Sequence, residues 1–222
     1  GAITIWSSAE AANVTVNGGN ITASDDSREA YVFPADATIE GVEDVGYIVA
    51  TIGDAGFETL EAAIKAAKAG QTIKLVRDIT ASQIITIDKA VTINGNGHTL
   101  TSTAGRAINI DTTGNVVIND LTINAGERAI NIINKASTVE LNNVTATAKN
   151  NAVMIATSAG AVKLTINDSD LTGLAVVNVA GAGAEVEINN TNITNVDATA
   201  AENYGAITIW SSAEAANVTV NG

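Results

Sequence analysis

The sequence predicts an all-β protein whose chain winds into a solenoid of about seven stacked coils, with one short capping helix. Strands recur at a nearly constant interval, each repeat places asparagine at the same turn, and large rings are rare. Of the 222 residues, 46% are hydrophobic but only 3% are aromatic, so Ala, Val, Ile and Leu must fill the core. Because β-branched residues favour pleated strands, this composition agrees with a β fold.

The repeat is clearest in the pentapeptide RAINI, which begins at Arg106 and again at Arg128. The equivalent apolar position recurs at intervals of 22, 23, 24 and 30 residues, at Ile108, Ile130, Val153, Val177 and Ile207. Short strands with period-two alternation, joined by polar turns at such an interval, indicate stacked coils.

A second strand in each unit ends in asparagine. Equivalent residues of stacked strands lie about 4.8 Å apart, so we expect inward amides that hydrogen-bond to the amides above and below. This predicted internal ladder consists of Asn94, Asn119, Asn142, Asn167, Asn189 and Asn221. A second file beside it is predicted from Thr101, Thr122, Thr145, Thr172 and Thr194.

One helix is predicted over residues 57–70, ahead of coils that occupy 71–222. Thr59 is the expected N-cap, and Gly70 is expected to end the helix. A narrow apolar stripe on this alanine-rich segment suits a lid over the open end of a solenoid, where strand edges need cover.

Two stretches, FETLEAAIKAAKAGQTIKLVRDIT (Phe57 to Thr80) and ITIDKAVTINGNGHTL (Ile85 to Leu100), resemble the capping helix and early coils of the pectin-lyase-like superfamily. The resemblance extends over roughly Ile52 to Asn221. It implies a right-handed parallel β-helix. The chain also resembles tandem-repeat cell-surface proteins of bacteria and archaea, of the surface-layer or adhesin kind. Because the superfamily includes lyases, adhesins and surface-layer proteins, the resemblance implies fold rather than function.

The segment GAITIWSSAEAANVTVNG occurs at 1–18 and again, without a mismatch, at 205–222, an offset of 205 − 1 = 204 residues. We therefore expect a window on a longer periodic chain. Residues 1–24 would be the last coil of a preceding repeat, and 25–56 an acidic, aromatic-containing junction. The alternative is a separate subunit that carries two copies of its last coil and joins a neighbour by strand donation or swapping. Both interpretations give a fibre of blocks stacked end to end.

Aromatic residues are absent between Glu58 and Asn203 and collect where one block would meet the next. The expected inter-block contact consists of Tyr204, Trp210, Trp6, Tyr31, Phe33, Tyr47 and Phe57. Carboxylates also concentrate in the junction, and Ca²⁺ takes six to eight oxygen ligands. The calcium candidates are Asp25, Asp26, Asp36, Glu40, Glu43 and Asp44. The alternative is a solvated acidic surface and a protein without a cofactor.

No catalytic residues are predicted. Arg106 and Arg128 are expected to form salt bridges, and Asp168 is expected to shape a turn rather than act as an acid. The chain has no Cys, so it can form neither a disulfide nor a thiolate metal site. A net charge of −13 would repel nucleic acid, and no apolar run reaches the roughly 18 residues that span a bilayer.

These observations lead to a hypothesis of a non-catalytic structural repeat in a secreted cell-surface filament or giant surface protein, with other copies of the block as its partner. Two other functions stay open: a carbohydrate-binding adhesin stalk that contacts surface glycans, and a polysaccharide lyase. The segment 195–204, with Trp210 nearby, is the expected partner or glycan contact.

Overall fold

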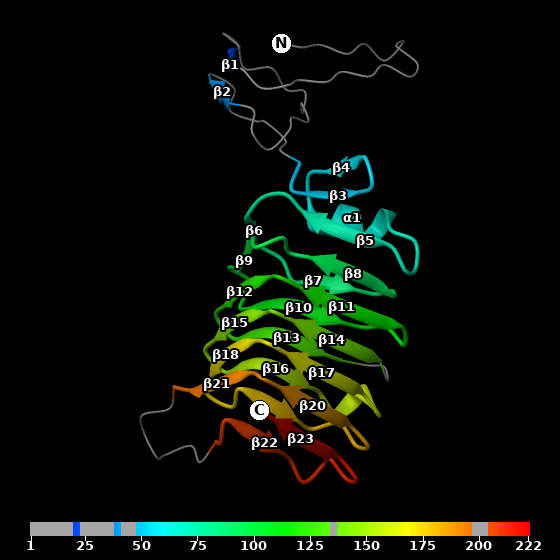
Figure 1. Ribbon diagram of the computed structural model, residues 1–222, viewed down its shortest axis with the longest axis vertical. Helices are drawn as coiled ribbons and strands as arrows, with labels where there is room; N and C mark the ends of the chain where they lie inside the picture. The colour runs from blue at the N-terminus through cyan, green and yellow to red at the C-terminus, as the bar shows by residue number, and fades with distance from the viewer. Residues whose placement is uncertain (1–19, 23–37, 41–47, 134–136, 197–203) are drawn as a thin grey trace.

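The computed structural model describes residues 20–22, 38–40, 48–133, 137–196 and 204–222. Its coils stack along one long axis as a parallel β-solenoid, and a complete coil gives one strand to each of three sheets (Figure 1). The fold class is therefore as predicted. The solenoid has about five complete turns rather than about seven, because the first and last coils contribute fewer strands.

The three sheets are named here by the order in which a coil visits them. The first sheet contains β7 (Ile85–Ile87), β10 (Arg106–Ile110), β13 (Arg128–Ile132), β16 (Asn151–Ile155), β19 (Val177–Val179) and β22 (Ile207–Ile209). The second contains β5 (Thr72–Leu75), β8 (Val91–Asn94), β11 (Asn115–Asn119), β14 (Thr138–Asn142), β17 (Lys163–Asn167), β20 (Glu185–Asn189) and β23 (Asn217–Asn221). The third contains β6 (Ile79–Ala81), β9 (Thr99–Ser102), β12 (Thr122–Ala125), β15 (Thr145–Ala148), β18 (Asp170–Gly173) and β21 (Asn192–Asn195).

Two further elements complete the described chain. A short 3-10 helix, η1 (Thr157–Ala159), follows β16. A separate pair of parallel strands is formed by β1 (Asn20–Thr22) and β2 (Thr38–Glu40).

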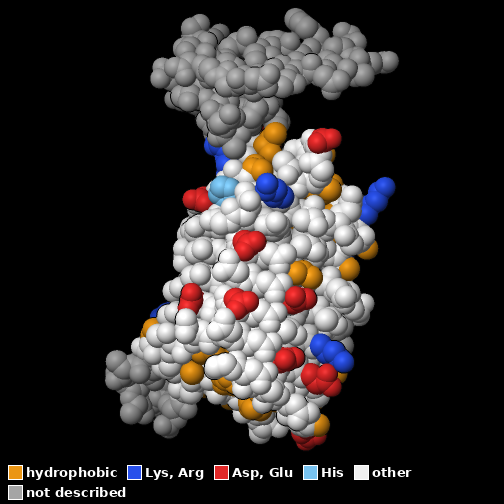
Figure 2. All heavy atoms as spheres, in the orientation of Figure 1, with side chains coloured by type: hydrophobic (Ala, Val, Ile, Leu, Met, Phe, Trp, Pro, Cys, Tyr) orange, Lys and Arg blue, Asp and Glu red, His pale blue; other side chains and the backbone are white. Residues whose placement is uncertain are grey.

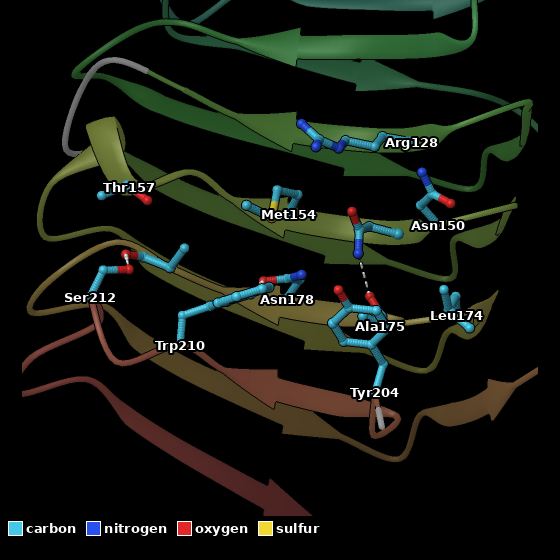
Figure 3. A pocket seen from close by; sticks show the side chains of 12 residues that line it. Arg128, Asn150, Met154, Thr157, Leu174, Ala175, Asn178, Tyr204, Trp210 and Ser212 are labelled. Atoms are coloured by element: carbon cyan, nitrogen blue, oxygen red, sulfur yellow. Dashed lines mark hydrogen bonds between the residues drawn. The ribbon is translucent and has the colours of Figure 1, made fainter. Parts of the chain in front are cut away.

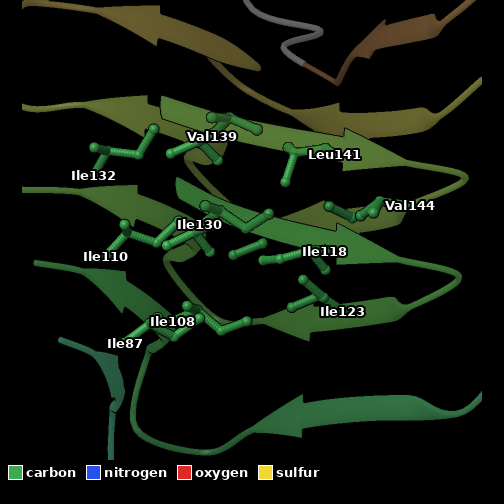
Figure 4. Packing of buried hydrophobic residues seen from close by; sticks show 14 of the residues in the cluster. Ile87, Ile108, Ile110, Ile118, Ile123, Ile130, Ile132, Val139, Leu141 and Val144 are labelled. Atoms are coloured by element: carbon green, nitrogen blue, oxygen red, sulfur yellow. The ribbon is translucent and has the colours of Figure 1, made fainter. Parts of the chain in front are cut away.

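The interior is filled by aliphatic side chains that stack on their counterparts in neighbouring coils. In the first sheet Ile108 pairs with Ile130, and Ile110 pairs with Ile132, and all four are fully buried (Figure 4). Full burial of such a side chain contributes about 1.5–3 kcal/mol. Because each coil presents the same kind of side chain to the next, the cross-section stays constant and the stack can propagate.

The N-terminal end of the stack is closed by a hairpin and a helix. The hairpin consists of β3 (Ala50–Ile52) and β4 (Ala55–Phe57), and β3 pairs antiparallel with β5. The helix α1 (Leu60–Ala66) begins where predicted, since the Thr59 side chain accepts a hydrogen bond from the Ala62 backbone N–H at 3.0 Å. This lid covers strand edges that would otherwise be open to pairing.

The helix is shorter than the predicted range of 57–70. Phe57 belongs to β4, and the backbone becomes extended at Ala67, where ψ is 140°. Lys89 from the following coil donates from Nζ to the carbonyl oxygens of Lys65 at 3.2 Å and Ala67 at 3.4 Å. A cation at these last carbonyls satisfies the helix C-terminus, so the helix ends before the glycine expected to stop it.

Asparagine side chains form a ladder at the end of the second sheet. Each donates from Nδ2 to Oδ1 of the asparagine one coil earlier. The bonds are Asn142 to Asn119 (2.8 Å), Asn167 to Asn142 (2.8 Å), Asn189 to Asn167 (2.9 Å) and Asn221 to Asn189 (2.9 Å). Asn94 lies in register with Asn119, and its Oδ1 accepts from the Asn96 backbone N–H at 2.9 Å.

The sequence predicts that the ladder amides point into the interior, and this prediction is wrong. In β14 and β17 the last inward residues are Leu141 and Ile166, and the asparagine that follows each is half-buried on the outward side of the pleat. An amide carries two N–H donors, and only one of them is used along the ladder. At a half-buried corner the other reaches water or a neighbour such as the Glu140 carboxylate, 3.0 Å from Asn142 Nδ2, whereas in the core it would stay unpaired.

The residue after a ladder asparagine adopts a left-handed backbone. The φ angles are 51° at Asp120, 52° at Asn143, 49° at Asp168 and 46° at Asn190. Asn and Asp tolerate this region better than other residues with a Cβ. Their side chains also pair between coils, Asn143 with Asp120 at 2.8 Å and Asn190 with Asp168 at 2.5 Å. The prediction that Asp168 shapes a turn is confirmed, and Asp120 occupies the equivalent turn position.

The predicted single file of threonines is wrong, because the structure divides it between two register positions of the third sheet. Thr101, Thr172 and Thr194 share one position, and Thr122 and Thr145 share another, two residues earlier. The cause is the place of the threonine within its strand, since it is the first residue of β12 and β15 but the third residue of β9, β18 and β21. The predicted threonine follows its ladder asparagine by three residues in the coils of Asn119 and Asn142, and by five in those of Asn167 and Asn189. A difference of two keeps the side chain on the same face but moves it along the strand.

We expect Asn167→Ala to lower the free energy of unfolding by about 1–3 kcal/mol, because it removes two ladder hydrogen bonds and leaves the Asn142 Oδ1 and the Asn189 Nδ2 without their ladder partner. Urea denaturation measures this. Thr165→Val, at another half-buried outward position of β17, is the control and should change stability by less than about 0.5 kcal/mol. Equal effects of the two substitutions would mean that the ladder adds nothing beyond strand pairing.

Asp78 holds the turn that contains the only histidine. Its Oδ1 accepts from the Thr99 backbone N–H at 2.9 Å and lies 3.3 Å from His98 Nδ1. The hydrogen bond from Thr99 lowers the pKa of Asp78 below its ordinary value of 3.8, against a smaller opposing effect of desolvation, and His98 lowers it further.

Because the folded-state pKa of Asp78 is the lower one, its contribution to stability is complete above the unfolded pKa and is lost as pH falls through the folded value. We expect Asp78→Asn to be less stable than the parent at neutral pH and to approach it in acid. Unfolding free energies measured from pH 7 down to about pH 2 test this, together with NMR titration of the carboxyl group. A carboxyl that titrates at or above 3.8 would contradict it.

Candidate functional site

A cleft of about 510 Å³ opens on the outer face of the first sheet, toward the C-terminal end of the solenoid. Several coils build it, so residues far apart in the sequence meet there (Figure 3). Its lining consists of Arg128, Asn150, Asn151, Met154, Thr157, Leu174, Ala175, Asn178, Ala180, Tyr204, Trp210 and Ser212.

The floor of the cleft is one file of outward positions in the first sheet. Met154 and Asn178 of this file line the cleft, and Asn131 lies in register with them one coil before Met154. Two neighbouring amides are buried and already bonded: Asn151 Nδ2 donates to the Ala175 carbonyl at 2.7 Å, and Asn178 Oδ1 accepts from Trp210 Nε1 at 2.6 Å. The floor is therefore polar and fixed in orientation.

Two aromatic rings form one side of the cleft. The ring centroids of Tyr204 and Trp210 are 6.2 Å apart, and their planes are inclined at 48°. Trp210 is 42% exposed although its indole N–H is bonded to Asn178. Ser212 donates from Oγ to the Ala180 carbonyl at 3.0 Å, which fixes the chain just beyond the ring. The ring is thus held in place while part of its surface stays open to solvent.

Arg128 supplies the positive charge of the cleft. Its Nη1 donates weakly to Asn131 Oδ1 at 3.5 Å. Its Nε lies 4.0 Å from a Glu127 carboxylate oxygen, and this Nε is buried and has no hydrogen-bond partner among the described residues. The other Glu127 oxygen lies 3.4 Å from Nε of Arg106. The expectation that Arg106 and Arg128 form salt bridges is confirmed, and the two residues lie in register one coil apart.

This arrangement suits the binding of a ligand. No carboxylate or imidazole of the described chain lines the cleft, so no pair of acids faces a bound ligand there. Open ring surface, fixed amides and a guanidinium with spare donors match a ligand that has apolar ring faces and hydroxyl or carboxylate edges.

The other residues singled out in the sequence lie elsewhere. Asp168 is in the turn before β18. The nearby acid Asp170, not among the residues singled out in the sequence, is in the third sheet, where Asn192 Nδ2 donates to its carboxylate at 2.7 Å. The two arginines lie in the first sheet, so the structure does not bring these acids and bases together in one site.

The proposed calcium ligands cannot be placed. Asp25, Asp26, Asp36, Glu43 and Asp44 lie outside the described residues, and of Glu40 only its position in β2 is described. Among the described side chains, no group of three His, Cys, Asp or Glu could hold a metal ion. Acidic side chains lie scattered along the face shown in Figure 2. No helix within the described ranges is long and apolar enough to cross a membrane.

Of the expected inter-block aromatics, only Tyr204 and Trp210 meet each other in the described structure. Phe57 is half-buried in β4 at the opposite end of the solenoid, whereas Trp6, Tyr31, Phe33 and Tyr47 lie outside the described residues. Sequence reasoning missed the role of Asn151 and Asn178. The available signal was the outward position between the two buried anchors of each first-sheet strand, which Asn178 occupies.

A family model described as “Putative pectate lyase-like adhesive domain” matches residues 55–154, from the β3–β4 hairpin into β16. Over these residues the chain is similar to pectin-lyase-like β-helix proteins, and the parallel β-solenoid agrees with that likeness. The matched part of this β-helix protein includes Arg128, Asn151 and Met154 of the cleft but ends before Tyr204 and Trp210. Comparison with curated proteins and with solved structures finds no significant match.

Proposed function

We propose that this β-helix protein is an adhesive domain of a cell-surface protein and that it binds a saccharide in the cleft. The observation that carries the proposal is the placement of an exposed, oriented Trp210 and Tyr204 beside fixed amides and Arg128. Sugar rings present C–H faces that pack on aromatic rings and hydroxyl edges that pair with amides. The adhesive description of the matching family supports the same function.

The cleft is preorganised for such a ligand. Asn178 holds the Trp210 indole, and the Ala175 carbonyl holds the Asn151 amide, so few side chains lose freedom on binding. Arg128 lines the cleft with a quarter of its side chain exposed, and guanidinium groups bind carboxylates in a bidentate manner. We therefore expect uronic-acid-containing glycans to bind more tightly than neutral glycans of the same length.

The proposal is tested on a glycan array, followed by titration of the best ligand with the full chain. We expect Trp210→Ala to weaken binding tenfold or more, because an exposed Trp in a concave site is a typical energetic centre of recognition. Thr219→Ala, on the exposed surface of β23, is the control and should bind as the parent does. A parent that binds no glycan, or a Trp210→Ala variant that binds equally well, would overturn the proposal.

The same experiment separates binding from catalysis. We propose no enzymatic activity and no cofactor, so chelation should leave glycan binding unchanged and polyuronides should release no unsaturated product. Release of such products by the parent would favour a lyase instead.

We also propose that copies of this domain join end to end into a filament. The last coil favours this: Val220 is 55% exposed and Ile209 is 51% exposed, while Ile188 and Val179, in register one coil earlier, are fully buried. An uncovered end of aliphatic side chains and free strand edges is what a following coil would cover.

End-to-end joining predicts oligomers whose size rises with concentration in sedimentation velocity. We expect Val220→Lys to shift this association to at least tenfold higher concentration, because a charge would be buried in the contact. Ile84→Lys, at an exposed aliphatic side chain in another coil, should associate as the parent does. A chain that remains monomeric at all concentrations would contradict joining between separate copies.

A further inference from the structure

Within the described residues, β21 is the last strand of the third sheet. The last coil gives β22 to the first sheet and β23 to the second, but within the described ranges it gives none to the third. The strand β21 therefore pairs with β18 on one side and has no described partner on the other. Such an edge presents a row of unpaired backbone N–H and C=O groups, which is a template for another strand.

The side-chain packing shows the same gap. Leu100, Ile123 and Leu171 occupy the inward position of earlier third-sheet strands and are almost completely buried. Ile193 occupies this position in β21 and is only partly buried. An apolar residue one coil further on would cover it.

The sequence contains a strand of the required kind. The two preceding third-sheet strands begin three residues after a ladder asparagine, at Asp170 after Asn167 and at Asn192 after Asn189. In the first copy of the duplicated segment, Asn17 is the counterpart of Asn221, and Asn20 follows it by the same three residues. Asn20-Ile21-Thr22 repeats the residues Asn192-Ile193-Thr194.

The turn that leads to this strand fits as well. The position after the ladder asparagine is left-handed, with φ of 49° at Asp168 and 46° at Asn190. Its counterpart after Asn221 is Gly222, with φ of 107°, and glycine reaches such angles without strain. The Asn190 backbone N–H donates to the Asn221 carbonyl at 2.9 Å, so the coil-to-coil register is kept up to this turn.

The segment 20–22 is itself a strand of a parallel sheet. It forms β1, which pairs with β2 in the register Asn20 to Thr38, Ile21 to Ile39 and Thr22 to Glu40. Its edge away from β2 has no described partner, so one free edge is available on β1 and one on β21.

We propose that Asn20–Thr22 of a second copy of this sequence adds to β21 as the missing third-sheet strand of the last coil. Asn20 then lies beside Asn192, Ile21 covers Ile193, and Thr22 lies beside Thr194. The inference rests on the proposed end-to-end joining and names its contact: one copy supplies two strands of the last coil, and the next copy supplies the third.

Cysteine cross-linking tests the register directly, because the chain has no cysteine of its own. Chains carrying Asn20→Cys are mixed with chains carrying Asn192→Cys and oxidised. Residues in register on neighbouring strands lie about 4.8 Å apart, within disulfide reach. The control pairs Thr22→Cys with Asn192→Cys, which is two residues out of register and about 8 Å apart, beyond that reach. We expect at least tenfold more cross-linked dimer from the in-register pair.

A second arm uses a chain of two copies in which Gly222 is followed by Gly19, with Asn192→Cys in the first copy and Asn20→Cys in the second. A disulfide in this chain but not between separate chains supports the contact in a continuous chain, and disulfides in both arms support it between subunits. No excess over the out-of-register control in either arm overturns the inference. Oligomers that sediment normally without this disulfide would overturn the contact alone and leave end-to-end joining intact.

Discussion

Parallel pairing of each coil with the next, in register, is the constraint on which the rest of this structure depends. It places Ile130 on Ile108 and Asn142 on Asn119, so a side chain is stabilised by its counterpart rather than by a partner of another kind. Aliphatic residues serve inside because they stack without leaving polar atoms unpaired. Asparagine serves at the corner because its amide is both donor and acceptor, and can pass one hydrogen bond to each neighbour.

The cleft lies where this regularity is interrupted. Successive anchors are 22 to 24 residues apart through Val177, but the last interval, to Ile207, is 30 residues. The additional chain leads into Tyr204, which meets Trp210 over the outward file of the first sheet. Regular coils thus supply a rigid floor of fixed amides, and the one long interval supplies the rings. A binding site placed on stacked strands keeps its geometry because those strands cannot shift independently.

The two ends of the solenoid differ in a way that gives it direction. At the N-terminal end an antiparallel strand and a helix end the parallel order, and Lys89 ties the helix to the coil below. At the other end the last coil leaves aliphatic side chains such as Val220 uncovered. In the proposed end-to-end joining, the covered end of one copy would meet the uncovered end of the next, head to tail.

The sequence by itself determined the repeat interval, the buried anchors, the asparagine turn and the N-cap at Thr59, because each of these follows from local periodicity or local hydrogen bonding. Only the tertiary structure decided the outward orientation of the asparagines, the division of the threonines into two files and the early end of the helix. These depend on the register of the stacked strands and on contacts from neighbouring coils, such as that of Lys89 with the helix. The cleft was decided in the same way. Arg128 and Trp210 are 210 − 128 = 82 residues apart, and only the stacking of coils brings them to one surface.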